Sequence, residues 1–138
     1  MKKMKTSKSL LVLAFFLFSL AGIAQKAGDT TVIQNVDAKK FNEMLEKKDG
    51  ILIDLRTPGE IEKGFIKGSV MIDYTDKSFE QEFAKLNKNK TTYIYCAGGG
   101  RSGDAAVYLK EHGFKKVVNL AKGFNDWKKQ GMAVEVKK

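Results

Sequence analysis

The sequence predicts a single α/β domain, built on a central parallel sheet with helices on both faces. Short runs rich in β-branched and aromatic residues alternate with segments whose apolar residues recur at helical spacing. The run 51–55 is apolar except for Asp54, which is typical of a strand buried on both faces of a parallel sheet. The chain has 138 residues and shows no internal repeat or linker, so one domain accounts for it.

The expected elements alternate along the chain, which implies right-handed crossovers between parallel strands. Strands are expected at 31–36, 51–55, 70–72, 91–95 and 117–120. Helical segments are expected from the cap Asp37 to Gly50, at 60–63, from the cap Ser78 to Leu86, around 105–109 as far as Gly113, and over 123–130.

The composition excludes several classes of protein. Cys96 is the only cysteine, so an internal disulfide and a multi-cysteine metal or iron–sulfur site are both excluded, and we expect neither a metal ion nor a cofactor. The net charge is +9, but the excess consists of scattered lysines without clustered arginines or interleaved aromatics. This pattern does not suit a nucleic-acid surface. Arg56 and Arg101 are the only arginines among 25 basic residues, so each is a candidate for a specific role.

The first 24 residues have the order of an export signal. Lysines at 2, 3, 5 and 8 precede an apolar run at 10–20, and small residues follow at 21, 22 and 24. We therefore predict a signal peptide at 1–24, an N-terminal lead-in at 25–35 and the folded domain at 36–138. The protein would be exported, to the periplasm in a bacterium with an outer membrane, and would have no membrane contact after cleavage. The alternative is an uncleaved anchor, although the apolar run is shorter than a bilayer requires.

A glycine-rich loop follows the strand expected at 91–95. It reads Cys-Ala-Gly-Gly-Gly-Arg-Ser over residues 96–102 and lies before a helix, where open α/β sheets place ligand sites. Consecutive glycines allow backbone N–H groups to turn toward a common centre, and the helix adds its positive end, with Ser102 as its expected cap.

Such a cradle stabilises a thiolate. We expect the loop amides, the helix end and Arg101 to lower the pKa of the Cys96 thiol, which makes Cys96 a candidate nucleophile. The alternative is that Cys96 is a small buried apolar residue at the end of a strand. Its setting before three glycines and an arginine favours the functional interpretation.

Several motifs in order resemble the rhodanese domain family. Residues 96–103 are similar to the family loop Cys-x-x-Gly-x-Arg-Ser-Gly, and Asp-Leu-Arg-Thr-Pro at 54–58 with Glu60 is similar to Asp-Val-Arg-x-x-x-Glu. Gly-Phe-Ile-Lys-Gly-Ser at 64–69 resembles the family's Gly-His-Ile-x-Gly-Ala, with Phe65 in place of the common histidine and Lys67 where proline often occurs. Gly113, Phe114, Val117, Leu120, Gly123, Trp127 and Gly131 match the family's ending. The resemblance covers residues 36–136.

The resemblance implies sulfur transfer on a rhodanese-like fold. Cys96 would attack the outer sulfur of a donor such as thiosulfate, carry it as a persulfide and pass it to cyanide or a thiol. An exported protein is a further possible acceptor. The residues expected to bind substrate are Ala97, Gly98, Gly99, Gly100, Arg101 and Ser102, with Arg101 orienting the anionic group of the donor.

Asp54 in the second strand and Arg56 and Glu60 after it are expected to have a supporting structural role. The spacing of Arg56 and Glu60 predicts a structural ion pair that braces the neighbouring segment. Asp54, inside an apolar strand, is expected to be a buried carboxylate with satisfied hydrogen bonds and not an acid catalyst.

Three other functions remain open at this stage. A phosphatase or arsenate reductase of the same fold resembles this loop, but it has five residues between cysteine and arginine, whereas four separate Cys96 from Arg101. The shorter loop suits a single sulfur atom better than a tetrahedral oxyanion. A sulfane-sulfur carrier or binding module without turnover is the second alternative, and an inactive scaffold, which the retained cysteine disfavours, is the third.

Overall fold

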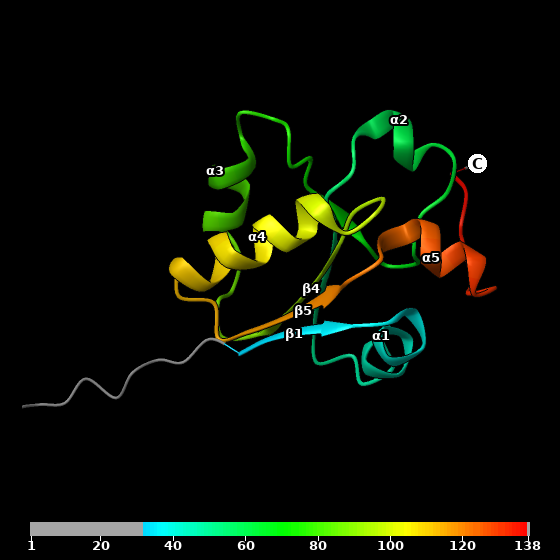
Figure 1. The fold of residues 1–138 in the computed structure, drawn as a ribbon. Helices are drawn as coiled ribbons and strands as arrows, with labels where there is room; N and C mark the ends of the chain where they lie inside the picture. Colours follow the sequence, from blue (N-terminus) through cyan, green and yellow to red (C-terminus); the bar gives the residue numbers. More distant parts are fainter. Residues whose placement is uncertain (1–31, 138) are drawn as a thin grey trace, which may run out of the picture.

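A computed structural model describes residues 32–137, which form a five-stranded parallel sheet (Figure 1). The strands lie in the order β1, β5, β4, β2, β3, and every neighbouring pair is parallel. Their bounds are β1 Val32–Val36, β2 Gly50–Asp54, β3 Val70–Met71, β4 Thr91–Tyr95 and β5 Lys116–Leu120. The predicted α/β class is confirmed, and the strands lie within one residue of their expected bounds.

Helices cover both faces of the sheet. Their bounds are α1 Ala38–Leu45, α2 Pro58–Ile61, α3 Phe79–Ala84, α4 Gly100–Glu111 and α5 Gly123–Lys129. In Figure 1, α3 and α4 lie on one side of the strands and α1 lies on the other. The packing agrees, because α3 and α4 contribute to one buried cluster whereas α1 and α5 contribute to a second.

Alternate residues of the central strands point to opposite faces of the sheet. In β4, Ile94 belongs to the cluster beneath α3 and α4, whereas Tyr93 and Tyr95 belong to the cluster beneath α1 and α5. Cys96 continues this alternation and lies on the α4 side, 1% exposed. The alternation therefore directs the cysteine toward the helix that follows it.

The domain begins earlier than the sequence motifs indicate. The whole of β1 pairs with β5, from Val32 beside Lys116 to Val36 beside Leu120, so residues 32–35 of the expected lead-in belong to the sheet. The predicted signal peptide at 1–24 lies outside the described residues. Within 32–137, no helix is both long and apolar enough to cross a membrane.

Two helix starts differ in how they are capped. The Asp37 carboxylate accepts a hydrogen bond of 2.8 Å from the Lys40 N–H, which confirms Asp37 as the cap of α1. Ser78 stands at the cap position of α3, but its hydroxyl donates to Asp76 at 2.7 Å and does not cap the helix. The Ser78 hydroxyl, which the sequence predicted as the cap of α3, is thus hydrogen-bonded to the Asp76 carboxylate instead.

Candidate active site

The loop at 96–102 joins the carboxyl end of β4 to the first turn of α4, as the sequence predicts. The Cys96 sulfur lies 3.1 Å from the Gly99 nitrogen and 3.5 Å from the Ser102 nitrogen, and both N–H groups donate to it. The Ser102 hydroxyl oxygen is a third polar atom at 3.5 Å. The loop therefore turns its donors toward the sulfur of Cys96.

Two opposing effects set the pKa of the Cys96 thiol. Burial raises the pKa of the thiol, since it disfavours the charged thiolate. Hydrogen bonds from Ser102 and from the amides of Gly99 and Gly98 act in the opposite direction and hold the pKa below its ordinary value. Cys96 is thus buried yet poised to ionise, which is the combination that a nucleophilic thiol needs.

Only one of the three consecutive glycines has a left-handed backbone. Gly99 has φ of 103°, and a Cβ there would lie 1.9 Å from the Ala121 carbonyl oxygen. At Gly98 and Gly100 a Cβ would meet no atom within 4 Å. The conformation of the loop therefore depends on Gly99, whose freedom from a side chain allows close contact with the segment after β5.

A second glycine, Gly123 at the start of α5, holds the loop from the other side. A Cβ on Gly123 would lie 2.5 Å from the Ala97 carbonyl oxygen. The close approach lets the Phe124 N–H donate to the Cys96 carbonyl at 2.8 Å and the Asn125 N–H donate to the Ala97 carbonyl at 3.0 Å. The helix α5 thus fixes the backbone on which the cysteine stands.

Ser102 does not cap α4, contrary to the prediction. The helix begins at Gly100 with Gly99 at the cap position, so Ser102 lies inside the first turn. Its fully buried hydroxyl donates to the Gly99 carbonyl at 3.2 Å and stays beside the Cys96 sulfur. The early helix start places Ser102 where its hydroxyl can contact the thiol.

Arg101 forms a two-pronged ion pair with Glu60, which comes from α2. The distances are 2.9 Å from Nη1 to Oε2 and 2.7 Å from Nη2 to Oε1. The hydrogen bond from Arg101 is the main cause that lowers the pKa of the Glu60 carboxyl to about 2. Glu60 is in turn the main cause that raises the pKa of Arg101, and the Cys96 thiol adds a smaller contribution.

The predicted ion pair between Arg56 and Glu60 is wrong. Arg56 instead binds the Asp54 carboxylate, with Nε 2.9 Å from Oδ1 and Nη2 2.6 Å from Oδ2. Its Nη2 also donates to the Gly64 carbonyl at 2.8 Å, and its guanidinium lies 3.9 Å from the centre of the Phe124 ring. These contacts connect Arg56 to β2 through Asp54 and to the segment after α2 through Gly64.

Asp54 is the satisfied buried carboxylate that the sequence predicts. It is 1% exposed and accepts from the Arg56 side chain, from the Arg56 N–H at 3.0 Å and from the Tyr95 hydroxyl at 2.5 Å. The same hydroxyl accepts from the Ile66 N–H at 3.1 Å. Sequence reasoning missed Tyr95, although its place directly before Cys96 in a buried strand was a usable signal.

A cleft of about 410 Å³ opens beside the loop, between α2 and α5. The lining residues are Arg56, Thr57, Gly59, Glu60, Lys63, Ala97, Phe124, Asn125 and Lys128. Since Arg56 and Glu60 are neutralised by their partners, Lys63 and Lys128 give the cleft a positive character. A small anionic or polar molecule could approach the loop here.

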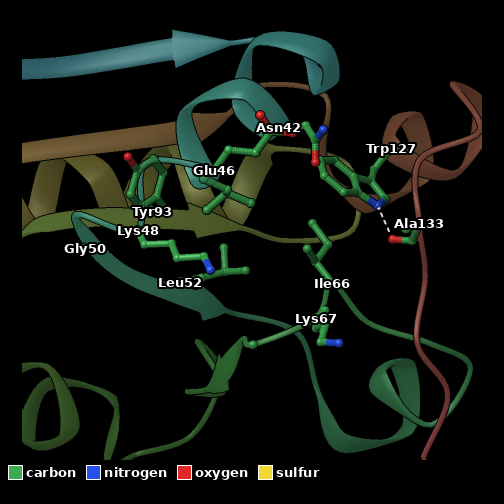
Figure 2. Close-up of a pocket in the computed structure, with 12 residues that line it drawn as sticks. Asn42, Glu46, Lys48, Gly50, Leu52, Ile66, Lys67, Tyr93, Trp127 and Ala133 are labelled. Atoms are coloured by element: carbon green, nitrogen blue, oxygen red, sulfur yellow. Dashed lines mark hydrogen bonds between the residues drawn. The ribbon is translucent and has the colours of Figure 1, made fainter.

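A second cavity, of about 460 Å³, lies away from the loop between α1 and the segment after α2 (Figure 2). Leu52, Ile66, Tyr93 and Trp127 contribute apolar walls, and the Trp127 N–H donates to the Ala133 carbonyl at 2.9 Å. None of its lining residues belongs to the loop at 96–102. It is separate from the candidate active site.

The position that often carries histidine in the resembling family has a structural role here. The Phe65 N–H donates to the Glu135 carbonyl at 2.8 Å, and the Glu135 N–H donates to the Phe65 carbonyl at 2.9 Å. Lys67 lies 3.5 Å from the Glu135 carboxylate. Within residues 32–137, no group of three or more His, Cys, Asp or Glu side chains is arranged to hold a metal ion.

A buried cysteine follows the carboxyl end of a parallel strand, with amides directed at its sulfur, which defines an α/β protein with a cysteine held in a loop of backbone donors. The chain belongs to the rhodanese-like domain family, because the model of that domain matches residues 37–130. The resemblance inferred from the motifs is confirmed.

Individual relatives agree with this family. A sulfurtransferase of Allochromatium vinosum is 28% identical over 104 residues, which cover 75% of this chain and 95% of the relative. A tRNA uridine(34) hydroxylase of Pelagibacter ubique is 35% identical over 96 residues, which cover 69% of this chain but only 32% of that enzyme. The crystal structure of a rhodanese-related protein from Thermoplasma volcanium has a TM-score of 0.67 at 25% identity and covers 75% of this chain and 99% of that one.

Proposed function

We propose that the protein is a sulfurtransferase in which Cys96 carries sulfane sulfur from a donor such as thiosulfate to a thiophilic acceptor such as cyanide or a thiol. The observation that carries this proposal is the polar surroundings of the sulfur: the Gly99 and Ser102 amides donate to it, and the Ser102 hydroxyl oxygen lies beside it. A thiolate is needed for the attack, and the same amides can stabilise the negative terminal sulfur of a persulfide. Membership of the rhodanese-like family supports the same chemistry.

The reaction balances without a cofactor. The Cys96 thiolate attacks the outer sulfur of thiosulfate, the S–S bond of the donor breaks, and sulfite leaves with the electron pair. Cyanide then attacks the terminal sulfur of the persulfide, so that thiocyanate forms and the Cys96 thiolate returns. Each step is a displacement at sulfur, in which the leaving group takes the electrons of the broken bond.

Intact-mass spectrometry of the protein after incubation with a sulfur donor tests this proposal. Incubation with thiosulfate should add about 32 Da, one sulfur on the thiolate, and cyanide should remove it. Absence of the adduct with thiosulfate and also with a persulfide donor, or an adduct that persists in Cys96→Ser, would refute the proposal. Turnover of an aryl phosphate without sulfur transfer would favour the phosphatase alternative. Release of sulfur to a protein acceptor alone would favour the non-turnover carrier.

We further propose that the protein works after export. The basis is the order of charge, apolar run and small residues in the first 24 positions. Expression of residues 1–138 in a bacterium with an outer membrane should yield a periplasmic protein that begins at Gln25. A product that retains residue 1 in the cytoplasmic fraction would refute export.

A further inference from the structure

The cation of the active-site loop already has an anionic partner. Both prongs of the Arg101 guanidinium bind the Glu60 carboxylate, at 2.9 and 2.7 Å. The side chains are 26% and 33% exposed, respectively, so the ion pair lies at the surface beside the buried sulfur. A donor that approaches Cys96 therefore meets a neutral pair and not a free guanidinium.

Glu60 is also held from its own side of the pair. Its Oε2 accepts from the Thr57 N–H at 2.9 Å and from the Thr57 hydroxyl at 2.9 Å, which closes the first turn of α2. These contacts keep the carboxylate at Arg101 without the cost of ordering a free side chain. The ion pair is thus a built feature of the site.

A guanidinium fork binds oxyanions through two parallel hydrogen bonds. The sulfonate of thiosulfate is such an oxyanion and is attached directly to the sulfur that is transferred. It can take the paired Nη1 and Nη2 face of Arg101 only by displacing Glu60, and where it approaches the remaining N–H groups the carboxylate of Glu60 repels it. The persulfide of an organic thiol carries no oxygen on either sulfur, so it needs no free fork beside Cys96.

We propose that Glu60 sets the donor preference of Cys96: by occupying Arg101, it disfavours thiosulfate and leaves persulfides of organic thiols as the preferred donors. The inference rests on the proposed sulfurtransferase function. In this step the Cys96 thiolate attacks the outer sulfur of the persulfide, the S–S bond of the donor breaks, and the organic thiolate leaves. Glu60 acts through Arg101 and is a positioning residue.

Lys63 and Lys128 do not remove this discrimination. Both line the cleft beside Glu60 and attract anionic groups of any donor. Carboxylates of an organic persulfide can meet these lysines at a distance from its sulfur atoms, whereas the sulfonate of thiosulfate is fixed next to the reacting sulfur. The two lysines thus favour an anionic carrier whose charge is remote from the S–S bond.

The decisive variant is Glu60→Gln. Its amide oxygen can still accept from Thr57, because glutamine also serves in a capping box, but the side chain no longer neutralises Arg101. The ratio of kcat/KM for thiosulfate to kcat/KM for cysteine persulfide should rise about tenfold, the effect of one freed charge-assisted contact, mostly through KM for thiosulfate. Glu82→Gln removes the same charge from an exposed pair with Lys85 on α3 and should leave the ratio unchanged.

The double variant Glu60→Gln with Arg101→Gln should not show the rise in the kcat/KM ratio, because it has no Arg101 guanidinium to bind the sulfonate. A folded Glu60→Gln protein with an unchanged or lower ratio would overturn the inference. If that variant does not fold, the wild-type protein decides, because a preference for thiosulfate over cysteine persulfide would equally overturn it. Failure of both donors to load Cys96 in the wild-type protein would instead refute the proposed function.

Discussion

The two arginines of the chain both bind a carboxylate, but they do so in opposite surroundings. The Arg56 and Asp54 side chains are 4% and 1% exposed, and a tyrosine hydroxyl and a backbone carbonyl complete their hydrogen bonds. The Arg101 and Glu60 side chains are 26% and 33% exposed, and Glu60 lines the cleft beside the loop. The first pair is buried, and the second is partly exposed.

This difference separates a structural pair from one that can respond to a ligand. The buried pair cannot exchange partners, because either ion alone in the interior would be strongly unfavourable. The exposed pair can open, since water replaces part of what each ion loses. Arg56 therefore braces the segment after β2, whereas Arg101 is available to a donor that competes with Glu60.

The largest effect should come from breaking the buried pair. Arg56→Met leaves Asp54 without its cation inside the protein, and we expect a loss of about 3–5 kcal/mol in the free energy of unfolding, measured by urea denaturation. Lys40→Met, which breaks an exposed pair with Glu43, should change the same quantity little. Equal losses in the two variants would contradict the distinction between the pairs.

A smaller effect should appear at the thiol. Ser102→Ala removes the buried hydroxyl beside the sulfur and should raise the pKa of Cys96, because the side-chain hydrogen bond of Ser102 that helps to lower this pKa is lost. The pH dependence of thiolate ultraviolet absorbance measures this shift. Ser78→Ala, which removes an exposed hydroxyl bound to Asp76, should leave it unchanged. A Cys96 pKa that stays constant in Ser102→Ala would show that the amides alone stabilise the thiolate.

The smallest effect concerns the exposed pair and acid stability. The pKa of Glu60 is lowered from 4.5 to about 2, chiefly by Arg101, so its contribution is complete above pH 4.5 and is lost as the pH falls through about 2. Because the pair is partly exposed, screening limits this contribution to about 0.5–1 kcal/mol. Glu60→Gln should therefore be less stable than the wild type at pH 7, and the gap should close between pH 4.5 and 2. A stability difference between the two proteins that widens as the pH falls would contradict a lowered pKa of Glu60 in the folded state.

Local patterns predicted the fold well because each rests on short-range rules. The apolar run with Asp54 indicated a buried strand, and the glycine-rich loop indicated a cradle for a thiolate. The pairing of the two arginines could not be found in this way. The spacing rule that linked Arg56 to Glu60 applies within a helix, but α2 begins only at Pro58, and Glu60 instead meets a residue 41 positions away.

The start of α4 shows a similar limit. Three adjacent glycines leave open which one takes the left-handed conformation, and the choice is made by contact of Gly99 with the Ala121 carbonyl. That contact depends on the tertiary fold. As a result α4 begins at Gly100, earlier in the chain than a cap at Ser102 would allow. Ser102 is then a neighbour of the thiol and not a cap.

The contact between Gly123 and the loop bears on protein engineering. The Cys96 and Ala97 carbonyls are held by amides from α5, more than 25 positions later in the chain, at a glycine where a Cβ would collide with both. Residues 96–102 are therefore not expected to keep their conformation without α5. Grafting the cysteine loop onto another α/β scaffold would require a glycine-initiated helix beside it, and a database of loop sequences alone would not reveal that requirement.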